Sequence, residues 1–378
     1  MKYTILGAGI AGLSTAIALQ KIGIQAQVFE AAPEIKPLGA GLLLAANAVK
    51  AYQRLEIADK IVARGHLLPT FAILDQAGST ITLADAAAIS QRYGLHNFAI
   101  HRADLHEALL SELDAQYITT GKRAVQIEQN EADITIQFQD GTSATTDCLI
   151  VADGIHSAVR RQLLPDAVPR YAGYTCWRAV IDAGDLEWSA ASETWGTNGR
   201  FGIVPLSGNR IYWFACINAP ANDADMSRYT VADLQRHFGN YHAPIAQILA
   251  KTRDEDLVWN DIIDLKPVKN FAFGKIVLIG DAAHATTPNM GQGACQAIED
   301  AVVLADELAR NEKPEVAFRA FEQRRLKRTR YIVNNSRTLG WLAQISHPLL
   351  ATARNTLFRI IPESVNERQM KTLFEVDF

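Results

Sequence analysis

A glycine motif near the start of the chain constrains its fold more than any other feature. The motif has the spacing Gly-x-Gly-x-x-Gly and consists of Gly7, Gly9 and Gly12. It directly follows an apolar run, residues 3–6, and leads into a segment with apolar residues at helical spacing. A second apolar run, residues 26–29, then ends in Glu30. This strand–turn–helix–strand order is the context in which such a motif binds a dinucleotide.

Each part of the motif has a separate predicted role. Gly7 permits the tight turn, Gly9 lets the backbone approach a pyrophosphate, and Gly12 lets the helix pack closely on the strand. The helix N-terminus offers unpaired N–H groups to phosphates, and Glu30 is placed to accept hydrogen bonds from ribose hydroxyls. The contacts predicted in this part of the chain are Gly7, Gly9, Ile10, Ala11, Gly12, Glu30 and Ala31. The motif alone does not distinguish FAD from NAD.

Length and composition exclude several classes of protein. A chain of 378 residues predicts about two domains with a sizeable core. The net charge of −4 gives no electrostatic case for nucleic acid, and no apolar run approaches the ~18 residues of a membrane span. The four cysteines are widely spaced, which predicts buried thiols in the reduced cytoplasm and no disulfide framework or metal site. We expect no metal, and either a monomer or a homodimer.

One local cluster of charge departs from this even balance. Five basic residues lie close together: Arg324, Arg325, Lys327, Arg328 and Arg330. Since they fall in a segment of helical character, they are predicted to form the solvated face of a late helix.

The hydrophobic pattern predicts an α/β chain, α+β overall, with a discontinuous dinucleotide domain. Apolar runs at 3–6, 26–29, 149–152 and 276–279 are typical of a buried parallel sheet, with helices at 10–22, 45–64, 103–113 and 293–310. Runs at 175–181, 200–204 and 211–217 are richer in aromatic and β-branched residues, which indicates an inserted antiparallel sheet. Residues 71–74 and 80–83 form a predicted hairpin of the same sheet.

The predicted domain boundaries follow from these patterns. The dinucleotide domain comprises 1–69, 99–169 and 270–330, and the inserted domain comprises 70–98 and 170–269. Residues 331–378 form a predicted C-terminal helical segment. Its predicted packing positions are Leu339, Trp341, Leu342 and Ile345.

Two further motifs lie far from the first. Asp153-Gly154 follows a predicted strand, and Gly280-Asp281 follows another, ahead of Pro288 and the run Gly291-Gln292-Gly293. With the N-terminal glycines, these residues resemble the single-component flavin monooxygenases related to para-hydroxybenzoate hydroxylase. The resemblance covers almost the whole chain and is specific, because three separated motifs occur in the family order. It implies a Rossmann-like FAD-binding domain with non-covalent FAD, and NADH or NADPH as co-substrate.

The resemblance also implies roles for the distal residues. Asp281 is expected to accept hydrogen bonds from the ribityl hydroxyls, which NAD lacks. The backbone from Gly291 to Ala294 opens a helix whose N–H groups would face the pyrimidine edge of the isoalloxazine and stabilise reduced flavin. Arg102 is expected on the phosphate and ribose side. The remaining contacts that the family pattern implies are Val125, Asp153, Pro288, Gln292 and Gly293. His284 is predicted to be structural, and Arg160 and Arg161 are either surface charge or part of cofactor handling.

On the substrate side the chain is similar to the subgroup of FAD-dependent urate hydroxylase and zeaxanthin epoxidase. The similarity implies that Arg200 and Tyr212 face the substrate. Arg178 stands where the urate enzymes carry asparagine, which puts urate itself in doubt. Two guanidinium groups would favour an anionic or enolisable ring, and a hairpin would bring Arg200 and Tyr212 to one face. The alternative is that Arg178 or Arg200 pairs with a carboxylate at the sheet edge.

The function implied by the resemblance is NAD(P)H- and O2-dependent hydroxylation or epoxidation of a small aromatic, heteroaromatic or enolisable substrate, through a flavin C4a-hydroperoxide. Three alternatives stay open. One is an FAD-dependent oxidoreductase that inserts no oxygen, and another is a monooxygenase of a bulky xenobiotic or polyene. The third is a binding protein with the architecture of the GDP-dissociation inhibitors, against which Asp281 and the run 291–293 argue.

Overall fold

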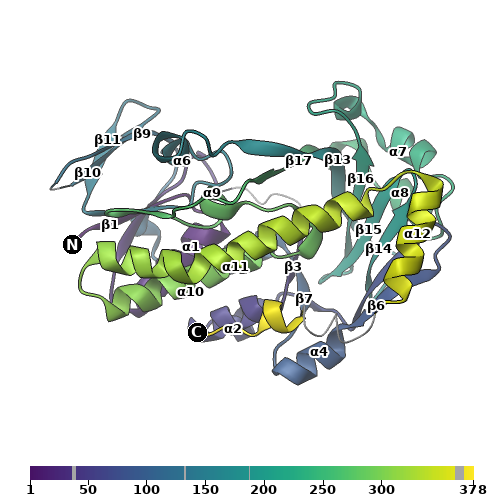
Figure 1. Cartoon of the computed structure of the whole chain (residues 1–378), viewed down its shortest axis with the longest axis horizontal. Coiled ribbons are helices and arrows are strands. Elements are labelled where there is room, and N and C mark those ends of the chain that lie inside the picture. The colour runs from purple at the N-terminus through teal and green to yellow at the C-terminus, as the bar shows by residue number, and fades with distance from the viewer. Residues whose placement is uncertain (36–39, 132, 187, 362–369) are drawn as a thin grey trace.

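A computed structural model describes residues 1–35, 40–131, 133–186, 188–361 and 370–378. Two large sheets, one of six strands and one of seven, lie next to each other. One long helix, α11 (Pro314–Ala343), runs across the molecule from the first sheet to the second (Figure 1) and contacts strands of both. The predicted α/β architecture with an inserted sheet is confirmed.

The six-stranded sheet has the predicted parallel core. In sheet order its strands are β18 (Ala272–Phe273), β19 (Ile276–Leu278), β12 (Cys148–Val151), β1 (Tyr3–Leu6), β2 (Ala26–Phe29) and β8 (Ile118–Thr119). All neighbours pair in parallel except β18 with β19. Every residue of β1, β12 and β19 is buried, which explains why these strands read as unbroken apolar runs.

Helices cover this sheet and pack on one another. They are α1 (Ile10–Lys21), α2 (Ala46–Arg54), α3 (Ala58–Val62), α5 (Arg102–Leu110), α9 (Asp281–His284) and α10 (Gly293–Arg310). Helix α10 lies against α1, α2 and α11. The single helix predicted for 45–64 is wrong, because Glu56 adopts a positive φ of 60° and divides it into α2 and α3.

Smaller elements complete this half of the chain. The meander β9 (Ala124–Gln129), β10 (Ile134–Phe138) and β11 (Ser143–Thr146) packs against α6 (Ala158–Leu163). A second three-stranded sheet contains β3 (Gly41–Leu44), β7 (Phe98–His101) and β4 (His66–Leu67). The short 3-10 helices are η1 (Ala115–Tyr117), η2 (Met226–Arg228), η3 (Asp254–Asp256) and η4 (Pro288–Met290).

The seven-stranded sheet is the predicted insertion. In sheet order its strands are β17 (Val258–Leu265), β13 (Pro169–Asp182), β16 (Arg210–Asn218), β15 (Gly199–Leu206), β14 (Ala191–Gly196), β5 (Thr70–Asp75) and β6 (Thr80–Asp85). All pairs are antiparallel except β14 with β5. The predicted hairpin of residues 71–74 and 80–83 is therefore confirmed as β5–β6, which extends the sheet beyond β14.

The two faces of this sheet have different partners. One face, which includes Phe201 and Trp213, packs against α7 (Val231–His237) and α8 (Ile245–Ala250) in an apolar cluster. The other face turns toward the first half of the chain, because the Tyr212 ring abuts Gly41 of β3. We call this second face the substrate face. Its members alternate with the first set along each strand, as the pleat requires.

The C-terminal part is helical, as predicted, but its predicted boundary and one of its predicted packing positions differ from the structure. Helix α11 contains the boundary proposed at residue 330, and α12 (Pro348–Arg359) follows after a short turn. Leu339 packs beside Trp195, whereas Trp341 is 69% exposed, so the prediction of Trp341 as a packing position is wrong. Helix α4 (Ala86–Tyr93) lies between β6 and β7 in the chain. The predicted segment also includes 362–369, which lie outside the described residues.

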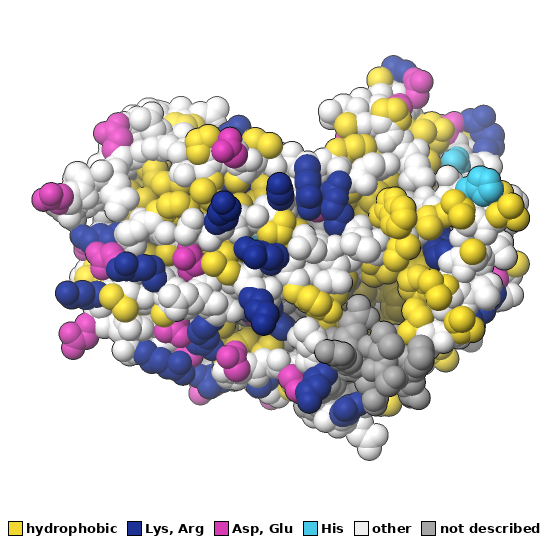
Figure 2. Space-filling view, in the orientation of Figure 1, with side chains coloured by type: hydrophobic (Ala, Val, Ile, Leu, Met, Phe, Trp, Pro, Cys, Tyr) yellow, Lys and Arg dark blue, Asp and Glu magenta, His cyan; other side chains and the backbone are white. Residues whose placement is uncertain are grey.

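The prediction of a wholly solvated basic face on α11 is also wrong. Lys327 and Arg330 are exposed, and Lys and Arg side chains do line this helix in Figure 2. Arg325, however, is 2% exposed. Its Nη1 lies 2.5 Å from Glu299 and its Nε 2.7 Å from Asp300, both fully buried on α10. The basic run therefore has an inner side that neutralises two buried carboxylates, which the local sequence could not reveal.

Candidate active site

The N-terminal turn has the geometry that its glycines predict. Gly7 has a φ of +99°, and a Cβ there would lie 2.4 Å from the Ala152 carbonyl oxygen. A Cβ on Gly12 would lie 1.9 Å from the Gly7 oxygen, so close packing of helix and strand excludes any side chain. Nothing lies within 4 Å of a Cβ built on Gly9. Internal packing thus explains two of the glycines, while the third faces open space at the N-terminus of α1.

Glu30 connects the end of β2 to this turn. One carboxylate oxygen accepts the Ala8 N–H at 2.7 Å and the other accepts the Ala32 N–H at 2.8 Å. The side chain therefore holds the turn in shape, and each oxygen keeps a lone pair for a further donor. Its predicted ribose contact, and that of the half-buried Ala31, stay predictions. Val125 is 48% exposed on β9, close to this strand end, since the Lys122 N–H donates to the Glu30 carbonyl at 2.8 Å.

The Gly280-Asp281 loop lies next to the same turn. Gly280 has a φ of +54°, and a Cβ there would lie 2.8 Å from the Ala11 Cβ, so strand end and helix start nearly touch. The Asp281 side chain is solvent-exposed, yet burial among protein atoms raises its pKa, while the nearby charges of His284 and Arg102 lower it. Arg102 and His284 therefore lie near the Asp281 carboxylate. The structure thus brings the first and third motifs together, with Gly280 next to the start of α1.

The following loop ends in the longest helix of the cofactor side. Helix η4 leads to Gly291, which has a φ of +62°, and α10 begins at Gly293 without a side-chain cap. Gln292 is 2% exposed, and its side-chain oxygen accepts from Asn47 and Gln296 at 3.0 Å. The side chain is thus committed to the core. Any ligand contact from Gln292 to Ala294 must come from backbone N–H groups.

Arg102 and Asp153 lie near the same loop. Arg102 is exposed, and its pKa is lowered by burial and by Arg178, with Asp281 acting in the opposite direction. Asp153 is half-buried, its Oδ1 has no hydrogen-bond partner among the described residues, and burial raises its pKa to about 6. Arg160 is fully buried and donates to the carbonyls of Ile155 and Ala167, so the reading of Arg160 as surface charge is wrong.

A buried polar network supports the Gly280 loop from behind. Asp300 accepts the Gly280 N–H at 2.8 Å, His284 Nε2 lies 2.6 Å from the same oxygen, and Arg325 binds the other oxygen. Glu299 is bonded by Asn47, Gln296, Arg325 and Arg328. The charges of His284 and Arg325 keep the pKa of Asp300 low against the effect of burial. The contacts of His284 agree with its predicted structural role.

The substrate face brings together all three predicted substrate residues. Arg178 lies opposite Phe214, Tyr212 opposite Val204, and Arg200 opposite Cys216 in the strand register. Directly opposed residues share a face, as do residues two apart. Arg178 donates to the side chain of exposed Asn260, and burial raises the pKa of Tyr212, so its hydroxyl stays protonated at neutral pH.

Arg200 contacts three neighbouring side chains. Its Nη1 lies 2.8 Å from Glu193, its Nε donates to Gln344 at 3.1 Å, and its guanidinium stands 5.1 Å from the Tyr174 ring centroid. Burial opposes the charge, but Glu193 together with Cys216 and Tyr174 outweighs it, so the pKa of Arg200 is raised. The ion pair of the alternative prediction is therefore present. It does not lie at the sheet edge, because β15 lies between β16 and β14.

Comparison with known proteins identifies the family. A family model described as FAD binding domain matches residues 1–336. The chain belongs to this family. Aurachin C monooxygenase/isomerase of Stigmatella aurantiaca is 35% identical over 98% of this chain and 97% of its own. FAD-dependent urate hydroxylase of Klebsiella pneumoniae is 35% identical over 89% of each. The crystal structure of Klebsiella pneumoniae HpxO with FAD and uric acid superposes with a TM-score of 0.91 at 31% identity, over 99% of this chain and 96% of that one. This protein is an FAD-dependent monooxygenase.

Further residues lie around the predicted contacts, in parts of the sequence that no motif marks. Glu193, Gln344 and Arg354 lie around Arg200, and the buried pair of Asp300 and Arg325 lies behind the Gly280 loop. The local signals were the adjacent acidic residues at 299–300, on a helix that also carries Asp306 and Glu307, and the place of Arg325 in the basic run.

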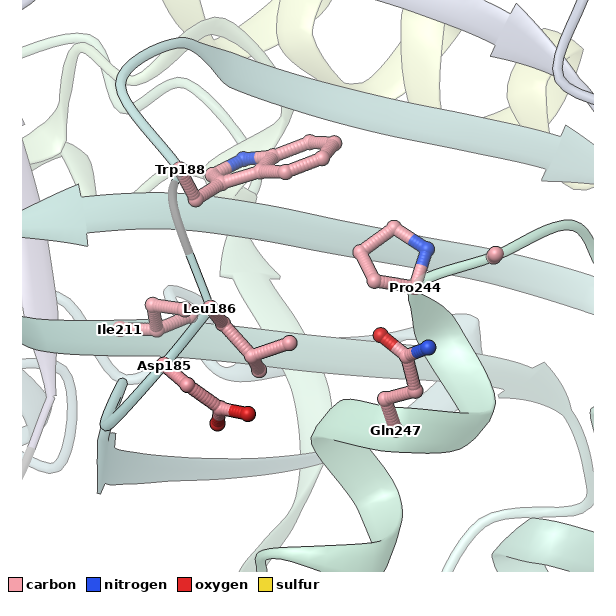
Figure 3. Close-up of a pocket in the computed structure, with 7 residues that line it drawn as sticks. Asp185, Leu186, Trp188, Ile211, Pro244 and Gln247 are labelled. Atoms are coloured by element: carbon pink, nitrogen blue, oxygen red, sulfur yellow. The ribbon is translucent and has the colours of Figure 1, made fainter.

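A separate surface pocket lies on the other face of the large sheet. Ile211, which points away from Tyr212, contributes to it, and Trp188 and Pro244 stand on opposite sides (Figure 3). The lining residues are Asp185, Leu186, Trp188, Ile211, Ala243, Pro244 and Gln247. The sheet of the monooxygenase separates this pocket from the predicted FAD contacts, so it is no part of the candidate active site.

Proposed function

We propose that the enzyme uses NAD(P)H and O2 to hydroxylate a small aromatic or heteroaromatic ring with an ionisable oxygen, held on the substrate face by Arg178, Arg200 and Tyr212. The observation that carries this proposal is the strand register, which gathers these side chains on the face that abuts β3 and the cofactor loops. Epoxidation of a comparable ring or double bond is the second form of the same reaction. The complex of a relative with uric acid supports a ring substrate.

The residues around Gly9, Asp281 and Gly291 fit FAD. In our proposal the pyrophosphate lies over Gly9 and the N–H groups of Ile10 and Ala11, where a Cβ would meet nothing. Asp281 holds the ribityl chain, and the backbone from Gly291 to Ala294 faces the pyrimidine edge. When bound, FAD supplies hydride acceptance and oxygen activation. The helix N-terminus at Gly293 would stabilise negative charge on the ring.

The side chains on the substrate face have separate tasks. Arg178 holds an ionised ring oxygen, because a guanidinium makes charge-assisted hydrogen bonds to it. Tyr212 donates a hydrogen bond, since its raised pKa keeps the proton on the hydroxyl. Phe214 and Val204 on the same face exclude water from the reacting carbon. Arg178 stands where the urate enzymes carry asparagine, and we therefore propose that the substrate is a ring other than urate.

Isotopically labelled O2 tests the reaction. The purified enzyme is screened for ring compounds that stimulate NAD(P)H oxidation, and peroxide is assayed in parallel. Incorporation of one labelled oxygen into the product is expected. Stimulated NAD(P)H oxidation without labelled product would instead establish an oxidoreductase that inserts no oxygen, and turnover confined to large polycyclic or polyene compounds would establish the bulky-substrate alternative.

Asp281→Ala tests the cofactor site without disturbing the fold. Among the described residues no hydrogen bond from the Asp281 side chain is present, so the change should leave unfolding unaltered. Loss of a charge-assisted contact should weaken FAD binding by about 1.5–3 kcal/mol, or roughly ten- to hundred-fold. Equal retention of FAD by the variant and the wild type would remove this role.

We also propose that the enzyme works in the cytoplasm, as a monomer or homodimer, without nucleic acid. Four free, buried cysteines support a reducing compartment, and the net charge of −4 gives no electrostatic case for nucleic acid. No helix in the described part of the chain has the length and hydrophobicity to cross a membrane. Mass measurement in solution tests the oligomeric state.

A further inference from the structure

Helix α12 buries an arginine at one end of the substrate face. Arg354 is only 4% exposed, and its guanidinium stands 5.1 Å from the ring centroid of Trp195 on β14. Trp195 lies opposite Arg200 in the strand register and shares the substrate face with it. The turn between α11 and α12 therefore covers this end of the face, and Gln344 from that turn accepts the Arg200 Nε–H.

The charges of this cluster do not balance. Arg200 and Arg354 are both positive, whereas Glu193 is the one carboxylate that influences both of them. Glu193 already binds Arg200 at 2.8 Å and the Trp195 Nε1–H at 3.0 Å. Arg354 donates only to neutral oxygens, on Leu342, Ala343 and Asn355. Among the residues that the structure describes, no carboxylate lies within ion-pair distance of Arg354.

Two buried donors in the cluster have no acceptor. They are Nη2 of Arg354 and Nε2 of Gln344, neither of which has a hydrogen-bond partner in the described part of the protein. A buried donor without an acceptor costs about 1–3 kcal/mol, and more when it is charged. Such a donor in a native protein calls for an explanation, and a bound ligand that accepts its hydrogen bond is one. Burial, and after it the charge of Arg200, lowers the pKa of Arg354 to about 10, which leaves it protonated at neutral pH.

The neighbouring residues join this cluster to the cofactor loop. Tyr174, under the Arg200 guanidinium, donates through its hydroxyl to Asn289 of η4 at 3.1 Å. Helix η4 leads directly into Gly291. The cluster is thus one hydrogen bond away from the loop that is expected to face the flavin. The hydrogen bond with Cys216 lowers the pKa of the Cys176 thiol, and the charges of Arg178 and Arg200 act in the same direction against burial.

We propose that Arg354 and Gln344, together with Arg200, form an anion-binding subsite that takes an ionised carboxylate or enolate oxygen of the ring substrate. The anion supplies the missing negative charge and accepts the two unpartnered donors. This inference rests on the proposed function and narrows its substrate class to ring compounds that are anionic at neutral pH. It also gives the C-terminal helix α12 a part in substrate selection.

The test compares two probes of the same shape, benzoate and benzamide, with the FAD-loaded enzyme in chloride-free buffer. Isothermal calorimetry measures both affinities, so no turnover is needed. Benzoate should bind about ten-fold more tightly than benzamide, as one charge-assisted contact provides. In Arg354→Met this preference should fall to about two-fold or less, because the excess positive charge is gone.

Matched variants separate binding from folding. Arg359→Met removes an exposed arginine of the same helix, paired with Asp75 at 2.8 Å, and should keep the full preference for benzoate. Gln344→Leu removes one unpartnered donor, together with the acceptor of the Arg200 Nε–H, and should reduce the preference partially, even if Arg354→Met fails to fold. Equal affinity for the two probes in the wild type, or an unchanged preference in Arg354→Met and Gln344→Leu, would overturn the subsite. Since labelled-oxygen incorporation is measured separately, the subsite and the proposed reaction can fail independently.

Discussion

Around the six-stranded sheet, the predicted FAD contacts are made mainly by backbone, whereas on the seven-stranded sheet the predicted substrate contacts are made by side chains. The cofactor side offers the turn at Gly9, the strand end at Gly280 and two uncapped helix N-termini. The substrate side assembles charged and polar groups from separate elements. They are Arg178, Glu193, Arg200, Tyr212, Gln344 and Arg354.

This difference explains how each side can vary. A backbone cradle needs glycine at fixed positions, because a Cβ at Gly12 would meet backbone at 1.9 Å. The shape of this backbone cradle therefore does not depend on which ring compound is the substrate. A set of side chains on a rigid sheet can change one residue at a time without altering the strands. The chain thus combines a cofactor site of fixed shape with a substrate site of adjustable charge.

The largest effect is expected from a variant of Asp300. It tests whether this side chain supports the FAD site by fixing the backbone of the Gly280 loop. Asp300→Ala leaves Arg325 with one carboxylate and removes the acceptor of the Gly280 N–H. Breaking a buried pair in this way should cost about 3–5 kcal/mol in the free energy of unfolding and weaken FAD binding. Urea unfolding and FAD titration measure both.

The control for Asp300 lies on the same helix. Asp306→Ala removes a carboxylate that pairs with Arg324 at 2.8 Å nearer the surface, and should cost about 1 kcal/mol or less. Similar losses in the two variants would contradict a special role for Asp300 behind the cofactor loop.

A pair of glycine variants separates fold from cofactor on the same turn. Gly12→Ala forces a Cβ against the Gly7 carbonyl and should cost about 3 kcal/mol of stability, with loss of FAD. Gly9→Ala meets no protein atom, so it should unfold like the wild type and lose only FAD affinity, about ten-fold. Thermal unfolding of the FAD-free proteins, followed by FAD titration, makes the comparison. A Gly9→Ala protein with unchanged FAD affinity would place the pyrophosphate elsewhere.

Arg200→Gln tests the substrate side. We expect FAD affinity to stay within about two-fold, while product formed per NAD(P)H falls and peroxide rises, since about 1.5–3 kcal/mol of anchoring is lost. The double variant Arg200→Gln/Glu193→Gln leaves no unpaired buried carboxylate at this position and should show the same uncoupling with better stability. Unchanged coupling on the true substrate would assign Arg200 to structure alone.

The smallest effect is a pH dependence from Asp153. Its folded pKa, raised to about 6 by burial, exceeds the unfolded value of about 3.9. The carboxyl therefore favours folding most below the unfolded pKa, and this contribution is lost as the pH rises through about 6. In FAD-free protein we compare the free energies of unfolding of Asp153→Asn and the wild type. The difference in favour of the variant should grow by roughly 1–2 kcal/mol from about pH 4.5 to pH 8. An equal difference at both pH values, measured by urea unfolding, would contradict the raised pKa.

Local patterns determined the cofactor side almost completely. The strands at 3–6 and 26–29 and the helix at 293–310 were predicted to the residue, because a buried parallel strand and an amphipathic helix each leave a periodic signature. The requirement for Gly12 is also local, since its Cβ would meet the Gly7 carbonyl, whereas the atoms that exclude a Cβ at Gly7 belong to Ala152 and Asp153, far away in the chain. Grouping Arg200 with Tyr212 succeeded for the same reason, since a hairpin register depends on neighbouring strands.

Tertiary structure alone decided which charges are buried and with whom. Arg325 and Arg330 look alike in the sequence, but only Arg325 meets Glu299 and Asp300 on α10. Trp341 was expected to pack and is exposed, while Arg354, in the second turn of α12, is enclosed. The physical reason is that the charge state of a buried group depends on partners far away in the chain. Such partners are set by how helices and sheets pack, and no local spacing encodes that.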